Sequence, residues 1–100
     1  MHFVMSYDLS ATGTRRTEIE EQIRTILNPY RNVRRLTTFY IIHVNNNNES
    51  ETIRRQLSDL SNRIDERLHF IMSPLMESGF YNGILPEDQW AEINAITNMG

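Results

Sequence analysis

The sequence predicts one small α+β domain in which two amphipathic helices cover one face of a β-sheet. Alternating, strand-like segments open and close the first three quarters of the chain. Two segments with a single apolar stripe at helical spacing lie between them. A length of 100 residues suits one domain with one core. We therefore expect a core over residues 1–76 and an appendage of the same domain over residues 77–100.

Composition narrows the classes of protein to which the chain can belong. The chain has no cysteine, which excludes disulfides, thiolate zinc sites and a cysteine nucleophile. No apolar run approaches the ~20 residues that cross a bilayer, so we expect a cytoplasmic protein with no membrane association. The formal net charge of -3 argues against a protein that coats nucleic acid through charge alone. Residues 1–50 nevertheless carry six of the ten arginines, so a local basic patch would lie there.

The first strand and the first helix follow from local patterns. Residues 2–9 alternate between two sets of side chains, which is the period of a β-strand. Thr17 and Glu20 have the spacing of a capping box, so we expect a helix to begin near Thr17. The helix should end near residue 28, before Pro29. One apolar stripe runs along it, formed by Ile19, Ile23, Ile26, Leu27 and Tyr30.

The middle of the chain contains a long β-rich stretch and a second helix. Residues 32–44 form either one bent strand or two strands, with a bend or bulge expected near Thr37 and Thr38. The four asparagines at positions 45–48 predict a turn or a flexible loop. Ser50 is the expected N-cap of the next helix, whose apolar stripe is Ile53, Leu57, Leu60 and Ile64.

The last strand of the core is followed by a segment of different character. Residues 68–73 alternate and end at Pro74, which predicts a strand. Turn signals between residues 77 and 83 predict a hairpin-like segment, and Pro86 opens a short helix that carries Trp90. This C-terminal segment should either pack on its own sheet or reach a partner. The order β-α-β-β-α-β is that of a ferredoxin-like two-layer sandwich.

Five residues are candidates for a functional site. Asp8 ends the first strand, and Arg15 and Arg16 lie at the mouth of the following helix, where backbone N–H groups favour anions. Arg34 and Arg35 lie in the second β segment. The plainer alternative is that Asp8 caps a turn and the arginines are solvated surface charges. One carboxylate is a poor Mg²⁺ site, so catalysis would require another acid or a second copy of Asp8.

Other kinds of site find less support in the sequence. His2, His43 and His69 fall on predicted strands without the spacing of a metal pair, so packing or surface exposure explains them. The chain contains no phosphate-cradling glycine loop and no serine or threonine within a nucleophile elbow. The candidate chemistry is therefore confined to Asp8 and the arginines.

Three segments together resemble a known group of proteins. Residues 3–9, FVMSYDL, look like an opening strand that ends in Tyr-Asp, and residues 33–39, VRRLTTF, are similar to the second strand of the same group. Residues 67–73, RLHFIMS, fit its final strand. The group comprises the small ferredoxin-like proteins around CRISPR-associated protein 2, with the SinR-like proteins and virulence-associated protein D. The resemblance covers about residues 2–75.

This resemblance implies a homodimer that acts on nucleic acid. In the nuclease members a divalent ion, here expected to be Mg²⁺, lies between two copies of the strand-end aspartate, which is Asp8 in this chain. The implied activity is cleavage of RNA, or less readily of DNA, with charge neutralised by Arg15, Arg16, Arg34 and Arg35. The alternative is a non-catalytic dimerising module that binds or regulates a partner through its sheet edge and C-terminal segment. A small-ligand sensor is a third possibility, for which no site residues stand out.

Overall fold

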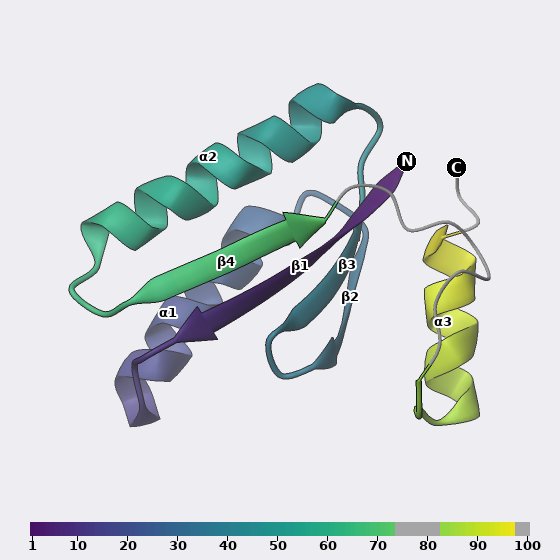
Figure 1. The fold of residues 1–100 in the computed structure, drawn as a ribbon, viewed down its shortest axis with the longest axis horizontal. Coiled ribbons are helices and arrows are strands. Elements are labelled where there is room, and N and C mark those ends of the chain that lie inside the picture. The colour runs from purple at the N-terminus through teal and green to yellow at the C-terminus, as the bar shows by residue number, and fades with distance from the viewer. Residues whose placement is uncertain (74–82, 98–100) are drawn as a thin grey trace.

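The computed structural model describes residues 1–73 and 83–97, except for the side chain of Arg35. Within these ranges the chain forms β1 (His2–Leu9), α1 (Gly13–Leu27), β2 (Asn32–Leu36), β3 (Phe39–His43), α2 (Asn47–Arg63), β4 (Leu68–Ser73) and α3 (Glu87–Thr97). The four strands form one antiparallel sheet in the order β2-β3-β1-β4 (Figure 1). The predicted α+β class is confirmed. None of the described helices is long and apolar enough to cross a membrane.

The main core lies between one face of the sheet and the two longer helices. Alternate residues of β1, from Phe3 to Leu9, pack against the apolar stripes of α1 and α2. These stripes contain the expected buried residues, Ile19, Ile23 and Leu27 on α1 and Ile53, Leu57 and Leu60 on α2. Because side chains alternate along a strand, the intervening residues of β1 point to the opposite face.

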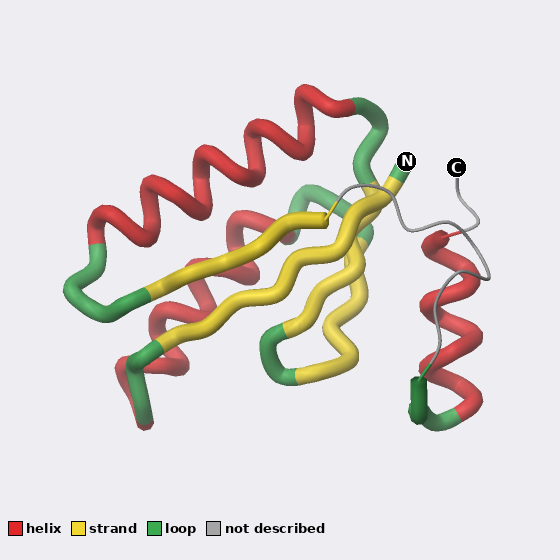
Figure 2. The backbone as a smooth tube through the Cα atoms, in the orientation of Figure 1, coloured by secondary structure: helices red, strands yellow, loops and turns green. Residues whose placement is uncertain are grey.

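The opposite face of the sheet is covered in part by α3, which stands on the other side of the sheet from α1 and α2 (Figure 2). Ile93 and Ile96 of α3 pack on Ile41 of β3, with Val33 and the half-buried Trp90 beside them. The terminal helix therefore packs on its own sheet, one of the two options that the sequence left open. The predicted hairpin-like segment lies largely outside the described residues.

Both long helices begin earlier than the sequence predicts. α1 begins at Gly13, and Thr17 lies inside the helix, where its hydroxyl donates to the carbonyl oxygen of Gly13 at 3.4 Å. The predicted capping box, with a helix start near Thr17, is therefore wrong. α2 begins at Asn47, and the side chain of Asn46 caps it by accepting a hydrogen bond from the N–H of Glu49 at 3.0 Å. The predicted N-cap at Ser50 is wrong as well, since an asparagine just upstream satisfies the same orphan N–H groups.

The β-rich stretch from residue 32 to residue 44 contains two strands. β2 and β3 form a hairpin whose turn contains Thr37 and Thr38, where a bend or bulge was expected. The irregularity in pairing lies slightly earlier, between Arg34 and Leu36. It leaves Arg35 opposite no single partner in the register.

Candidate functional site

An uncovered part of the sheet, which we call the open face, lies on the side of β1 and β4 away from α1 and α2. It consists of four exposed residues, Ser6, Asp8, His69 and Ile71. Ser6 pairs with Ile71 across the two strands, and Asp8 pairs with His69. The exposed fraction of Ile71 is 75%, which is high for an isoleucine. A carboxylate, an imidazole and an exposed apolar side chain therefore share one small surface.

Asp8 lies near the carboxyl end of β1, as the sequence predicts. Its Oδ2 accepts a hydrogen bond from Nη2 of Arg67 at 2.9 Å, in an ion pair whose two side chains are 67% and 56% exposed. Arg67 is held beside Asp8 because its backbone N–H donates to the hydroxyl of Ser10 at 2.9 Å. The observed hydrogen bond of Asp8 thus reaches the residue before β4 rather than the loop after β1. Such an exposed pair contributes only about 0–1 kcal/mol to the stability of the fold, so a stronger ligand of the carboxylate can displace Arg67.

Arg15 lies in the first turn of α1 and is engaged by two glutamates. Its Nε donates to Oε2 of Glu66 at 2.7 Å, and its Nη1 donates to Oε2 of Glu18 at 3.2 Å. These hydrogen bonds, first the one to Glu66, raise the pKa of Arg15, and Arg15 in turn lowers the pKa of Glu66. Since Glu66 directly precedes Arg67, Arg15 is the predicted arginine whose partner lies next to the open face.

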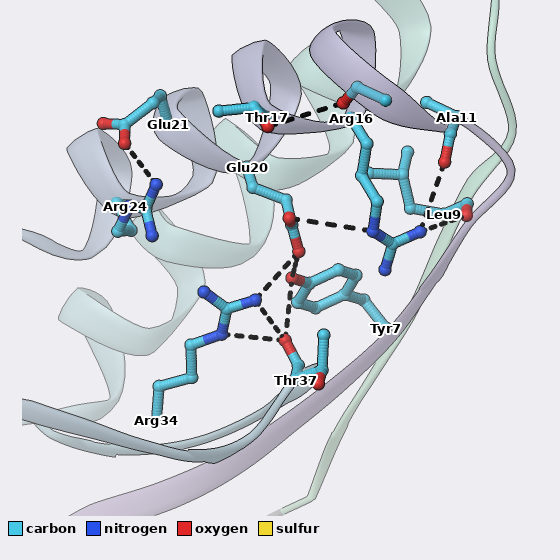
Figure 3. A network of polar contacts seen from close by, with 11 residues as sticks. Tyr7, Leu9, Ala11, Arg16, Thr17, Glu20, Glu21, Arg24, Arg34 and Thr37 are labelled. Carbon is cyan, nitrogen blue, oxygen red and sulfur yellow. Dashed lines mark hydrogen bonds and ion pairs between the residues drawn. The ribbon is translucent and has the colours of Figure 1, made fainter.

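Arg16 and Arg34 meet at Glu20 in a polar network between α1 and the sheet (Figure 3). Oε2 of Glu20 accepts hydrogen bonds from the Tyr7 hydroxyl at 2.6 Å and from Nη2 of Arg34 at 2.9 Å. Nε of Arg16 lies 3.7 Å from Oε1 of the same carboxylate. Arg16 also donates to the carbonyl oxygen of Leu9 at 2.8 Å, which ties α1 to the end of β1.

Aromatic packing completes this network, which we call the Glu20 network. The rings of Tyr7 and Tyr40 stack with centroids 6.5 Å apart, and the guanidinium of Arg34 lies 5.8 Å from the centre of the Tyr40 ring. Burial, followed by the hydrogen bond and the negative charge of Glu20, raises the pKa of Tyr7. Burial also raises the pKa of Tyr40. The network is a bonded unit that joins α1, β1 and β2.

The structure separates the predicted site residues into two groups. Arg16 and Arg34 lie with Tyr7 on the helix-covered side of the sheet, whereas Asp8 lies on the open face. Arg15 and Asp8 are linked indirectly, through the adjacent residues Glu66 and Arg67. Arg35 lies at the irregular point of β2.

Three residues near Asp8 or the arginines were missed by sequence reasoning. Arg67 and His69 become neighbours of Asp8 only through the pairing of β1 with β4. The period-2 pattern around residues 68–73 could have placed them on the same face as Asp8, if the pairing had been assumed. Glu20 was assigned to a capping box, which concealed its position as the shared acceptor of Tyr7, Arg16 and Arg34.

The open face offers oxygen and nitrogen ligands but not a complete metal site. In the described part of the chain, no three histidine, aspartate or glutamate side chains are grouped so that they could hold a metal ion. Comparison with known proteins found no matching family model, no similar curated protein and no similar solved structure. The functional inference therefore depends on the chemistry of the open face and on the resemblance of the sequence segments.

Proposed function

We propose that the chain is a homodimeric, metal-dependent endonuclease of ferredoxin-like fold that prefers RNA. Asp8 from each of two subunits holds one divalent cation, such as Mg²⁺. The observation that carries this proposal is the exposed carboxylate of Asp8 on the open face, whose one ion-pair partner among the described residues is Arg67, in a weak exposed pair. The sheet order β2-β3-β1-β4 and two helices on one face support the ferredoxin-like fold.

The ligand chemistry of Asp8 supports the second subunit. Mg²⁺ in proteins uses one or two carboxylates together with waters and substrate phosphate oxygens. Asp8 supplies one carboxylate, and a two-fold axis at the open face supplies the other from the second copy. The exposed side chain of Ile71 provides apolar surface beside Asp8, which such a contact would bury.

The residues around Asp8 suit a phosphodiester substrate. A divalent cation held by Asp8 would supply positive charge beside the phosphate and would lower the pKa of a bound water molecule. Once the Asp8 carboxylate binds a cation, Arg67 is released from its ion pair and is free to contact a phosphate oxygen. Arg15 pairs with Glu66, the residue that directly precedes Arg67 in the sequence. Arg16 and Arg34 contribute by holding the end of β1 and the β2–β3 turn in place.

The test compares the parent protein with Asp8→Asn and with the matched control Asp59→Asn on the exposed surface of α2. Each protein is assayed for cleavage of RNA and DNA with and without Mg²⁺, and its molar mass is measured by light scattering. We expect Mg²⁺-dependent cleavage, mainly of RNA, by the parent and by Asp59→Asn, and none by Asp8→Asn. A dimer mass is expected for all three.

Two results would contradict the proposal. Cleavage that survives in Asp8→Asn would show that Asp8 does not hold the cation, or that a contaminating nuclease is present. A parent protein that is monomeric at assay concentrations and cleaves neither substrate would show that two subunits do not share a metal site at Asp8.

A non-catalytic dimerising module is the second candidate, favoured by the internal pairing of the arginines. Arg15, Arg16 and Arg34 all form ion pairs with glutamates, which leaves less positive charge for nucleic acid. On this hypothesis the open face binds a second copy or a partner without chemistry. A dimer that cleaves nothing with Mg²⁺ or Mn²⁺, in the parent and in Asp8→Asn alike, would favour it over the nuclease.

A further inference from the structure

His69 is the histidine that the fold places beside the candidate metal ligand. It is the register partner of Asp8 in the antiparallel pair of β1 and β4, and both side chains are exposed on the open face. Directly opposed residues in such a pair have Cβ atoms about 4.5–5.5 Å apart. One subunit therefore presents a carboxylate and an imidazole side by side.

Neither Asp8 nor His69 packs in the core of the protein. Among the described residues, His69 has no hydrogen-bond or ion-pair partner, and Asp8 has only the exposed pair with Arg67. Histidine is the commonest metal ligand among side chains, and it binds through a neutral ring nitrogen. The pair is therefore available to a cation at little cost in existing contacts.

The number of ligands determines what the pair can hold. One chain supplies two ligands, and the described residues supply no group of three. The homodimer of the proposed function doubles the pair to two carboxylate oxygens and two imidazole nitrogens. Six-coordinate Mn²⁺ would keep two further positions for water and a phosphate oxygen. Mg²⁺ favours all-oxygen sites, whereas imidazole nitrogen favours transition metals.

We propose that His69 is a metal ligand together with Asp8, and that the dimer site binds Mn²⁺ in preference to Mg²⁺. This inference rests on the proposed function, because a single chain lacks half of the ligands. It changes the expected cofactor from Mg²⁺ to a transition-metal ion. It also assigns a role to a residue that the sequence alone placed in packing or exposure.

The experiment measures Mn²⁺ binding to the full chain after treatment with a chelator. Free Mn²⁺ is counted by its electron paramagnetic resonance signal, with Mg²⁺ added as a competitor. The variants are Asp8→Ala, His69→Ala and the control His43→Ala. His43 pairs with His2 on the same face, about 20 Å along the strand from Asp8. We expect one Mn²⁺ per two chains, and a dissociation constant at least ~10-fold higher in His69→Ala but unchanged in His43→Ala.

A second readout on the parent protein does not depend on whether a variant folds. Substoichiometric Mn²⁺ should broaden the imidazole proton signals of His69 in nuclear magnetic resonance spectra before those of His43. Equal broadening of both histidines would overturn the inference.

The possible failures are distinguishable. If Asp8→Ala loses Mn²⁺ and His69→Ala binds it like the parent, the inference is wrong and the Asp8 site of the proposed function stands. If the parent binds no Mn²⁺, the inference is also wrong. Dimer mass and Mg²⁺-dependent cleavage of the same preparation then decide the proposed function separately.

Discussion

Tyr7 is the residue at which the Glu20 network can be tested most simply. Its hydroxyl donates to the Glu20 carboxylate at 2.6 Å and lies in a part of the protein that is largely closed to water. Hydrogen bonds to charged groups contribute about 1.5–3 kcal/mol. We expect Tyr7→Phe to lower the free energy of unfolding by about 1–2 kcal/mol, measured by urea denaturation at neutral pH. Tyr30→Phe is the control, and equal losses in the two variants would contradict the role of the network.

The raised pKa of Tyr7 predicts that the stability of the protein falls at alkaline pH. Burial raises the pKa of Tyr7 in the folded protein above the ordinary tyrosine value of about 10. Above that pH the unfolded chain loses the Tyr7 proton while the folded chain keeps it, so the stability present at lower pH is progressively lost. The Tyr7→Phe variant has no hydroxyl proton at this position, so its stability does not fall for this reason. The difference in stability between parent and Tyr7→Phe should therefore shrink between pH 9 and pH 11, and a constant difference would contradict the assignment.

The sequence predicted where Asp8 lies along its strand, but it did not predict which side chains Arg15 and Arg34 contact. The end of β1 could be placed from the alternation of residues 2–9, so Asp8 was correctly predicted to lie at the end of a strand. Arg15 bonds Glu66, 51 positions away, and Arg34 bonds Glu20, 14 positions away. Such pairs depend on how the helices dock on the sheet, which no local pattern specifies.

At the scale of elements, the start of α2 can be tested through the side chain that caps it. Asn46 accepts the N–H of Glu49 at 3.0 Å, and Glu49 in turn accepts the backbone N–H of Asn45 at 3.1 Å. Loss of an N-cap side chain costs about 0.5–2 kcal/mol. We expect Asn46→Ala to destabilise the protein by about 1 kcal/mol in thermal or urea unfolding, and Asn46→Asp to preserve its stability. Asn62→Ala, near the other end of α2, should have little effect. A neutral Asn46→Ala would instead favour the predicted start at Ser50.

The faces of the helices were predictable, whereas their first residues were not. The stripes on α1 and α2 are repeated over several turns, so each added apolar residue strengthens the prediction. A helix start depends on one or two polar side chains, and Thr12, Thr17, Asn46 and Ser50 all had suitable chemistry. The packing of α3 on β2 and β3 was left open, because Trp90, Ile93 and Ile96 form an apolar surface that fits any apolar partner.

At the scale of the whole molecule, α3 and the open face divide one side of the sheet. α3 covers Ile41 and Val33 on β3 and β2, and it leaves the side chains of Ser6, Asp8, His69 and Ile71 exposed. A second copy that packed on this surface would bury the apolar side chain of Ile71 together with the polar groups beside it. The second copy required by the proposed metal site would cover this surface.

Ile71→Arg tests that arrangement without touching a proposed ligand. Two copies related by a two-fold axis at the open face would bring the substituted arginines close together, so their charges would repel and lose hydration. We expect light scattering to give the mass of two chains for the parent and of one chain for Ile71→Arg. Since the side chain of Ile71 is 75% exposed in the single chain, its replacement should leave the stability of the monomer nearly unchanged.

Ile84→Arg is the matched control for this change, because Ile84 is fully exposed and lies before α3 rather than on the sheet. It adds the same charge and removes the same apolar side chain, so it should remain a dimer. If Ile71→Arg also remains a dimer, the two copies meet elsewhere and Asp8 of one subunit does not face Asp8 of the other. If it becomes monomeric and loses both cleavage and metal binding while staying folded, the shared site and the dimer depend on the same surface.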